Sequence, residues 1–490
     1  MPHRLFGRAD WVLAITLILS YAYFYQAGGW NQNSRFDLIR AITNEHTLNI
    51  DPFQYSTGDK AFADGHFYSD KAPGLAFAAV PVVALARPFL RAAGGDPETY
   101  AGLAFLSWLA TVFTAGLFTA LAGVSLFSLS LDLGASRSGA LFAAIAFGLA
   151  TPIWTLATIF IGHAFAAALL VFAFAAACRI GSGVGDPAHR RVDVWRGAFV
   201  GVCAGWATIS EFPAAVPATL IAVLAAAQAL RFNRAQATRI IGAMTSCALA
   251  CAAVLMIYQY ACFGSPFHIA YSSEEGVYVG MREGFFGITL PRLVRLRRIL
   301  FGEYRGLLPI APVLAVAPIG LALIKRRGVA VVASLIALYF ILLNASYTYW
   351  EGGWSYGPRH ASPAIPFLCL GLAPLWTVGS RPVRWLLAVL AAYGIAVTLI
   401  AVSTMPLPPN NIRRPVAELL WPAFRDGDLS LNTQTFVSGG ANPDFRAHTE
   451  PKAAFNLGMK LGLQGRVSLL PLAVAWVACA AALSGGVRRR

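Results

Sequence analysis

Long apolar windows recur along almost the whole chain. A helix rises about 1.5 Å per residue, so about 20 apolar residues span the ~30 Å hydrocarbon core of a bilayer. Of the 490 residues, 57% are hydrophobic and 12% are charged, against about 25% charged residues in soluble domains. The windows cover residues 11–28, 100–131, 137–154, 157–179, 195–209, 211–230, 237–261, 306–325, 328–346, 360–377, 383–404 and 467–486. The sequence predicts an all-α polytopic membrane protein, with about twelve transmembrane helices in one integral membrane domain, residues 1–490.

Basic residues concentrate in the short links between these windows. The links are 189–196, 231–239, 325–327, 381–384 and the terminal run 488–490. Cytoplasmic loops of membrane proteins carry such an excess of Lys and Arg. The formal charge of +15 therefore indicates membrane topology, and no nucleic-acid partner is expected. We expect a multi-pass protein of the inner (plasma) membrane with both termini in the cytoplasm and an uncleaved first span.

This orientation leaves the longer, more acidic segments outside. These outer segments are 29–99, 262–305, 347–359 and 405–466. The orientation holds only if residues 73–92 do not cross, and their three prolines and Arg87 favour a juxtamembrane or re-entrant helix. An active site would then face the periplasm or exterior.

All seven cysteines lie in or at the ends of apolar windows. They are Cys178, Cys203, Cys247, Cys251, Cys262, Cys369 and Cys479. Their spacing fits neither a disulfide framework nor a set of metal ligands. We expect no cofactor and assign no metal site, and the sequence leaves a divalent metal open.

The first outer segment contains an amphipathic stretch, residues 34–46. Leu38, Ile39 and Ile42 share one face of a helix there, and Asp37 lies on the other. The pattern Ser34-x-x-Asp37 is also typical of a helix N-terminal capping box. Asp37 is thus either a capping residue or a carboxylate held at the membrane surface.

Three further acids in this segment also have two readings. Asp59 and Asp64 have turn chemistry, and Asp64-Gly65 is an ordinary turn signal. Asp70 and Lys71 precede a Pro-Gly break in "HFYSDKAPG". They form either a surface ion pair of little energetic weight or a lysine that binds a lipid phosphate.

Two later outer motifs combine arginines with aromatic residues. They are "GEYRGLLPIAPVL" (302–314) and "YWEGGWSYGPRHASPAIPFL" (349–368). An interfacial aromatic belt explains most of the Trp and Tyr residues. It does not explain Arg305 and Arg359, which lie on the side expected to be poor in arginine. These arginines indicate an anion site beside a sugar platform.

Two ionisable residues fall near the ends of apolar windows. His163 and Glu211 are both expected toward the outer leaflet. Ionisable residues within a membrane are candidates for function. They either line one cavity or are polar residues at helix ends.

The layout of one span, a large outer loop with an acidic juxtamembrane helix, and "YSDKAPG" resembles the GT-C superfamily of membrane glycosyltransferases. "HFYSDKAPGLAF" is similar to the "YFEKPPL" element of the aminoarabinose transferases and, more loosely, to "HPPLGK" of protein O-mannosyltransferases. "YWEGGWSYGPRHASPAIPFL" resembles a late Gly-Pro-Arg-Tyr segment of bacterial relatives.

The resemblance implies inverting transfer of a sugar from a polyprenyl-phosphate donor to a cell-envelope lipid, glycan or protein. A carboxylate of the first outer loop would be the general base, and basic residues would hold the lipid phosphate. The relatives carry an acidic pair after the first span, where this chain has "NQNSRF". The base therefore stays open among Asp37, Asp59 and Asp70, with Asp37 first. The candidate substrate-binding residues are Arg35, His66, Tyr68, Lys71, Arg305, Glu351, Tyr356, Arg359 and His360.

Two other classes of function compete with a transferase. A lipid or solute transporter would favour broken helices and ionisable groups at mid-membrane, whereas here those groups gather in the outer loops. A polymerase or ligase of polyprenyl-linked glycans would also use outer arginines, but it would not need the "SDKAPG" element. Membrane lipids are the expected surroundings in each case.

Overall fold

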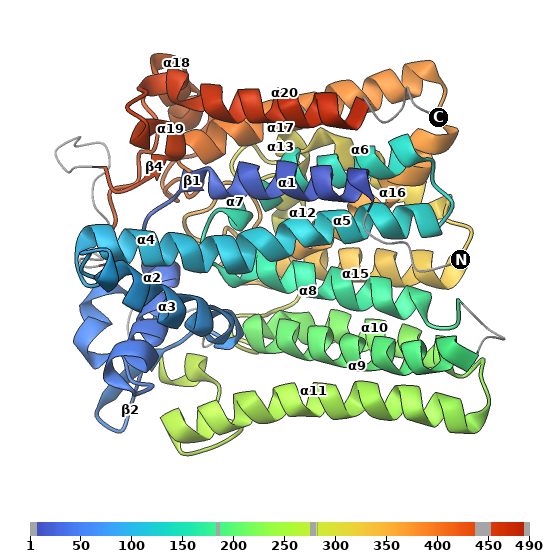
Figure 1. Cartoon of the computed structure of the whole chain (residues 1–490), viewed down its shortest axis with the longest axis horizontal. Helices are drawn as coiled ribbons and strands as arrows, with labels where there is room; N and C mark the ends of the chain where they lie inside the picture. The colour runs from blue at the N-terminus through green and yellow to red at the C-terminus, as the bar shows by residue number, and fades with distance from the viewer. Residues whose placement is uncertain (1–6, 183–186, 275–280, 282, 437–451, 485–490) are drawn as a thin grey trace.

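Long helices run side by side between two ends of the molecule (Figure 1). The structure is a computed structural model that describes residues 7–182, 187–274, 281, 283–436 and 452–484. Helices hydrophobic on all sides satisfy their backbone polar groups internally, which is the requirement for a segment that lies in lipid. The architecture is that of an integral membrane protein.

The first ten α-helices lie in the N-terminal half of the chain. They are α1 (Arg8–Ala22), α2 (Trp30–Arg40), α3 (Gly74–Ala92), α4 (Tyr100–Thr111), α5 (Leu117–Asp132), α6 (Arg137–Leu149), α7 (Ile153–Ala157), α8 (Gly162–Arg179), α9 (Pro187–Ser210) and α10 (Ala215–Ala229). A π-helical turn, Val112–Gly116, joins α4 to α5 in one long run. A second such turn, Ala41–Glu45, extends α2.

The remaining elements follow a long peripheral helix. They are α11 (Arg234–Phe263), α12 (Leu293–Phe301), α13 (Leu307–Ile310), α14 (Ala317–Ala322), α15 (Arg327–Ser346), α16 (Ile365–Val378), α17 (Arg381–Thr404), α18 (Trp421–Asp426), α19 (Leu457–Lys460) and α20 (Leu470–Ser484). The four short strands are β1 (Phe24–Tyr25), β2 (Lys60–Ala63), β3 (His66–Ser69) and β4 (Phe455–Asn456).

The predicted all-α membrane class is confirmed, but the predicted count of twelve spans is not. Within the described ranges, eight helices are long and apolar enough to cross a membrane, and three shorter apolar helices accompany them. The window 306–325 divides into α13, a 3-10 turn at Pro312–Val316, and α14. Proline lacks an N–H and cannot continue the hydrogen-bond ladder of a helix, which explains the division.

Helix α3 is one of the eight, although we expected residues 73–92 not to cross. Its first residue, Gly74, accepts a hydrogen bond from Trp206 Nε1 near the C-terminal end of α9. Near its other end, Arg87 pairs with Glu98, just before α4 begins. The C-terminal end of α9 and the start of α4 lie in the same half of the molecule (Figure 1). Length and composition permit a crossing, so the expected juxtamembrane position of α3 stays a prediction.

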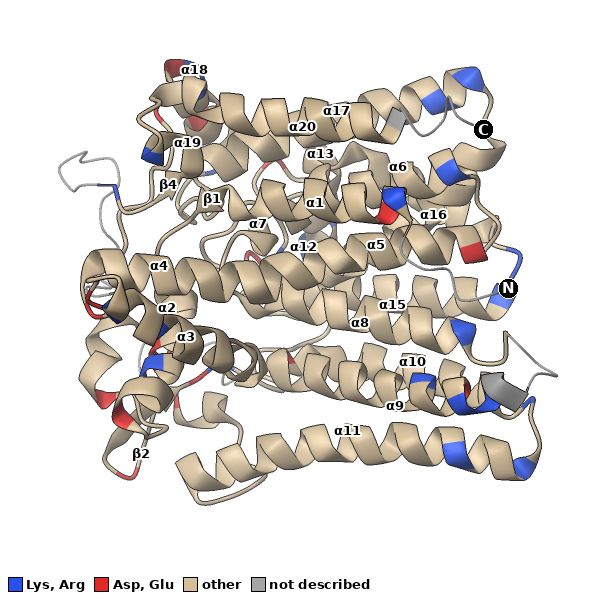
Figure 2. Ribbon diagram, in the orientation of Figure 1, with Lys and Arg blue, Asp and Glu red and all other residues tan. Residues whose placement is uncertain are grey.

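Charge separates the two ends of the bundle (Figure 2). Lys and Arg gather at the end where α9 and α11 begin, which we call the basic end. Most Asp and Glu lie at the opposite end, around α2, α3 and β2, which we call the acidic end. This arrangement follows the distribution of charge between cytoplasmic and outer loops that the sequence predicts.

The core of the bundle surrounds α8. This helix is alanine-rich, and nearly all of its residues are buried, including Phe165, Leu170 and Phe174. A helix that is hydrophobic on all sides belongs in the interior of a bundle. All seven cysteines are free, and five of them are buried, as expected for packing residues.

Glycines of α9 bring α11 close to the bundle. Gly197, Gly201 and Gly205 recur every four residues, and a Cβ at Gly201 would overlap the backbone of Met244 on α11. Small residues at this spacing let membrane helices approach closely. Helix α11 is otherwise mostly exposed, so α9 is its main attachment.

Two small two-stranded sheets lie toward the acidic end. Strands β2 and β3 form an antiparallel hairpin. The predicted turn is confirmed at Asp64 (φ 49°) and Gly65 (φ 86°), both left-handed as a tight hairpin turn requires. Strands β1 and β4 pair across the chain and join the end of α1 to residues 455–456.

Candidate active site

Side chains of helix α2 contact three groups of candidate residues, through Ser34, Arg35 and Asp37. The helix begins at Trp30, after Gly29, so Ser34 is an interior residue and does not cap the helix. Of the two readings of Asp37, the capping box at Ser34-x-x-Asp37 is therefore wrong, because the helix starts four residues before Ser34. The Ser34 hydroxyl instead contacts Ser69 Oγ at 2.8 Å and donates to Asp70 Oδ1 at 3.3 Å.

The first group, which we call the Asp37 cluster, comprises Asp37, Arg40, Ser56, Arg87 and Glu98. Asp37 is fully buried; it accepts a hydrogen bond from Ser56 Oγ and lies 3.4 Å from Arg40 Nη1. Arg40 and Arg87 each lie 2.9 Å from a Glu98 oxygen. Two carboxyl groups thus alternate with two guanidinium groups. This series of ion pairs joins α2 to α3 and to the start of α4.

Burial decides the protonation of Asp37. It raises the pKa of Asp37 to about 7, although the Ser56 hydroxyl and the Arg40 charge act in the opposite direction. Burial also acts to raise the pKa of Glu98, but hydrogen bonds from Arg40 and Arg87 outweigh it and lower that pKa. A carboxyl with a pKa near neutrality is suited to accept a proton at physiological pH.

The second group, which we call the Lys71 cluster, comprises Lys71, Asp59, Asp70 and Glu274. Lys71 Nζ lies 2.7 Å from Asp70 Oδ2 and 3.0 Å from Asp59 Oδ2. Residue Glu274 reaches the cluster through a β-bridge to Ala61 of β2. Asp70 and Lys71 form an ion pair, but the expectation of a surface pair is wrong because the Asp70 side chain is fully buried and that of Lys71 is only 11% exposed. Phosphate binding by Lys71 stays a prediction.

Carboxyl groups outnumber cations in the Lys71 cluster. Burial and the neighbouring Asp70 raise the pKa of Glu274 to about 8. Burial also raises the pKa of Asp70, against the Lys71 charge. Burial thus favours the neutral form of Glu274 at pH 7, and Lys71 has carboxyl partners on both Asp59 and Asp70.

The third group, which we call the His163 cluster, comprises Arg35, Glu211, His163 and His360. Arg35 Nη2 lies 2.8 Å from Glu211 Oε1, and His163 Nδ1 lies 3.6 Å from Glu211 Oε2. The rings of His163 and His360 are 5.3 Å apart, edge to face. His163 and Glu211 thus lie together at one site.

Arg35 connects the His163 cluster to the Lys71 cluster. Its Nη1 donates to the carbonyl of Ala72, the residue after Lys71, at 2.8 Å. Tyr271 lies beside both groups, because its ring is 5.7 Å from Lys71 Nζ and 6.2 Å from the ring of Phe212. The two clusters therefore form one polar region.

Two arginines meet across a glycine turn. Gly352 (φ 71°) and Gly353 (φ 63°) are both left-handed, which favours glycine. Arg305 Nη2 donates to Gly353 O at 2.9 Å, and a Cβ at Gly352 would lie 2.8 Å from Arg359 Cγ. Among the described atoms, Nε and Nη1 of Arg305 and Nε of Arg359 are buried without a hydrogen-bond partner. Such donors can accommodate an anion.

The other predicted residues lie outside these contacts. His66 is exposed on the hairpin, and its Nδ1 is 2.6 Å from Asp51 Oδ2. Tyr68 is buried with its ring 5.3 Å from Phe263. Tyr356 packs in a hydrophobic cluster with Ile310, which favours a packing role over a sugar platform. Glu351 is a partly buried residue of the turn before Gly352.

Several residues of the site escaped the sequence reasoning. Glu98 follows a Gly-Gly-Asp-Pro run that indicates only a turn. Ser56 ends a short 3-10 helix, Asp51–Ser56, and carries no motif. No grouping of three or more His, Cys, Asp or Glu suited to a metal ion occurs in the part of the chain described.

The chain has the fold of the GT-C membrane glycosyltransferases. The apo structure of ArnT from Cupriavidus metallidurans gives a TM-score of 0.50 and 15% identity, covering 86% of this chain and 70% of that chain. The structure of the same protein bound to undecaprenyl phosphate gives a TM-score of 0.49 with the same identity and shares. The oligosaccharyltransferase AglB from Archaeoglobus fulgidus, in complex with an inhibitory peptide and a dolichol-phosphate, gives 0.45 and 11% identity, covering 89% of this chain and 61% of that chain.

These likenesses concern the fold alone, since identity is at most 15%. No family model matches the sequence, and no curated protein is similar to it at a significant level. The roles of the candidate residues therefore rest on their own geometry.

Proposed function

We propose that the chain is an inverting glycosyltransferase that moves a sugar from a polyprenyl-phosphate donor to a cell-envelope lipid, glycan or protein. The observation that supports this most is the buried Asp37, with a pKa of about 7, at the acidic end of a GT-C fold. The acceptor must lose a proton as it attacks the anomeric carbon, and a carboxylate of this pKa is suited to take it. The reaction would occur at the outer face of the inner membrane.

Arg305 and Arg359 are the stronger candidates for the donor phosphate. Their buried nitrogens lack partners among the described atoms, whereas the Lys71 ammonium already contacts Asp59 and Asp70. The ArnT of Cupriavidus metallidurans, which has this fold, binds undecaprenyl phosphate. Lys71 would then order Asp59 and Asp70 beside the reacting sugar, and we assign these two acids as the alternative bases. No cofactor is proposed.

Binding of undecaprenyl phosphate to the purified protein tests the donor class. We expect retention of this lipid by native mass spectrometry and weaker retention by Arg359→Ala. The matched control is Arg298→Ala, since Arg298 lies 5.7 Å over the Trp350 ring near the same turn. Equal retention by all three proteins would move the phosphate site elsewhere.

A further inference from the structure

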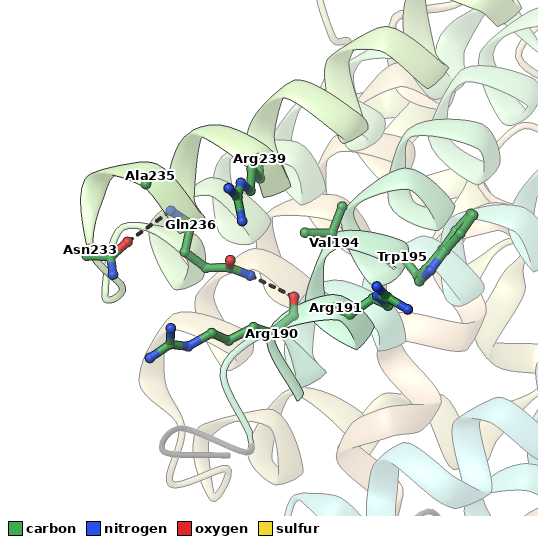
Figure 3. Close-up of a pocket in the computed structure, with 8 residues that line it drawn as sticks. All are labelled: Arg190, Arg191, Val194, Trp195, Asn233, Ala235, Gln236 and Arg239. Carbon is green, nitrogen blue, oxygen red and sulfur yellow. Dashed lines mark hydrogen bonds between the residues drawn. The ribbon is translucent and has the colours of Figure 1, made fainter. Parts of the chain in front are cut away.

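We propose that a cavity at the basic end, between α9 and α11, binds the phosphate headgroup of an anionic phospholipid. The cavity measures about 660 Å³ (Figure 3). It is lined by Arg190, Arg191, Val194, Trp195, Asn233, Ala235, Gln236 and Arg239. Arg190 and Ser210, at the other end of α9, are 20 residues apart, or about 30 Å along the helix. The cavity is thus separate from the candidate active site.

The charge of this cavity fits a phosphate. Three guanidinium groups line it, and among the described residues none of them forms an ion pair with a carboxylate. The one acidic residue in the sequence of α9, Asp193, is buried and pairs with Arg196 at 2.8 Å. Helix α11 contains no acidic residue. The cavity therefore carries an excess of positive charge.

The backbone adds to this attraction. Asn233 caps α11, accepting a hydrogen bond from Gln236 N at 3.0 Å, and Gln236 Nε2 donates to Arg190 O at 2.7 Å (Figure 3). These bonds fix the start of the 30-residue helix α11 against α9. The first N–H groups of a helix and its dipole both favour an anion.

The surroundings favour a lipid over a soluble phosphate. Trp195, Phe199 and Val202 are exposed by 70%, 49% and 43%, and their spacing places them on one face of α9. This stripe runs from the cavity toward the middle of the helix and offers apolar surface to an acyl chain. Basic pockets between membrane helices, at the side where Lys and Arg gather, are suited to lipid headgroups. The headgroup would lie in the cavity between α9 and α11, and the acyl chain would follow the exposed stripe along the outer surface of α9.

Native mass spectrometry of the full chain tests this site. The probes are phosphatidylglycerol, phosphatidylcholine and inorganic phosphate, with polyprenyl phosphate absent. One charge-assisted contact corresponds to about a tenfold change in affinity. We expect phosphatidylglycerol to bind at least about tenfold more tightly than phosphatidylcholine. A variant with Arg190→Gln, Arg191→Gln and Arg239→Gln should lose that preference, and the single variant Arg239→Gln should reduce it.

The control is a second triple variant, with Arg137→Gln, Lys325→Gln and Arg381→Gln, which also removes three positive charges from the basic end. All three are exposed and none lines the cavity. This control variant should still bind phosphatidylglycerol more tightly than phosphatidylcholine. Equal binding of the two lipids, or equal loss in the control and cavity variants, would overturn the proposal. Occupation of the cavity by inorganic phosphate with the affinity of phosphatidylglycerol would also overturn it, because the ligand would then be a soluble phosphate.

Discussion

At the scale of residues, Asp37 combines complete burial with a hydroxyl and a guanidinium partner. Asp37→Asn keeps the shape of the side chain and removes its basicity. If Asp37 is the base, turnover should fall by about 10²–10⁴-fold while donor binding stays intact. The measurement is product formation beside lipid binding by native mass spectrometry. Asp64→Asn, in the exposed hairpin turn, is the control and should leave both unchanged. Full activity of Asp37→Asn would transfer the role to Asp59 and then Asp70.

The pH dependence of turnover tests the same residue differently. A base must be deprotonated, and the pKa of Asp37 is raised to about 7, so activity should rise between about pH 6 and pH 8 and then level off. Arg40 lowers this pKa by its charge. Arg40→Gln should therefore shift the midpoint to higher pH, which a pH–rate profile of each protein would show. A midpoint near pH 4, as in an exposed Asp, would contradict the role of burial.

A third prediction at this scale concerns Lys71. Removing one partner of a buried ion pair leaves the other charge uncompensated, at a cost of about 3–5 kcal/mol. Lys71→Ala should therefore disturb both Asp59 and Asp70, lowering the melting temperature and weakening use of the donor by about tenfold or more. Lys60→Ala is the control, since Lys60 Nζ lies near Gln54 in the same loop, 3.2 Å from its carbonyl. Unchanged stability and turnover in Lys71→Ala would exclude both effects.

At the scale of elements, the glycine repeat of α9 determines how α11 packs. Gly201→Ala would overlap Met244 of α11, and overpacking costs about 1–3 kcal/mol. A Cβ at Gly242, on α11, would meet no atom within 4 Å, so Gly242→Ala should be neutral or stabilise the helix by up to about 1 kcal/mol. Thermal unfolding of the two purified variants distinguishes them. A Gly201→Ala protein as stable as Gly242→Ala would show that α9 and α11 are not closely packed.

Helix boundaries show where local sequence reasoning succeeds. The apolar windows match most of the long helices, because burial in lipid and in the core both demand continuous apolar sequence. The start of α2 at Trp30 was not predictable from Ser34 and Asp37, because Ser34 forms its hydrogen bonds with Ser69 and Asp70, 35 and 36 residues away. Long-range partners of this kind carry no local pattern.

At the scale of the whole molecule, the sequence predicts the class of fold and names about half of the residues that the structure gathers in the candidate site. Asp37, Asp59, Asp70, Lys71, Arg35, Arg305, Arg359 and His360 occupy the polar clusters or the glycine turn, whereas His66 and Tyr356 do not. Glu98 and Ser56 enter the Asp37 cluster only because α3 and a 3-10 turn fold back onto α2. Such pairings depend on tertiary packing, which a single sequence does not encode in a readable spacing.

The topology is testable on the whole chain. We predict segments 29–99 and 405–466 outside and both termini in the cytoplasm; Asn442, in the second segment, lies outside the described residues. In a background without native cysteines, Asp64→Cys and Arg91→Cys should react with an impermeant reagent from the outer side. Arg231→Cys, in the basic link after α10, should not. Labelling of Asp64→Cys and Arg91→Cys from opposite sides would show that α3 crosses the membrane.

Sugar transfer by the reconstituted full chain is the most direct test of the proposed function. Liposomes would contain the protein, a set of undecaprenyl-phosphate sugars and an extract of cell-envelope acceptors. We predict release of undecaprenyl phosphate over time with the wild-type protein and little release with folded Asp37→Asn. Movement of the intact lipid-linked sugar across the bilayer without cleavage, or no release from any donor by a folded protein, would contradict a glycosyltransferase.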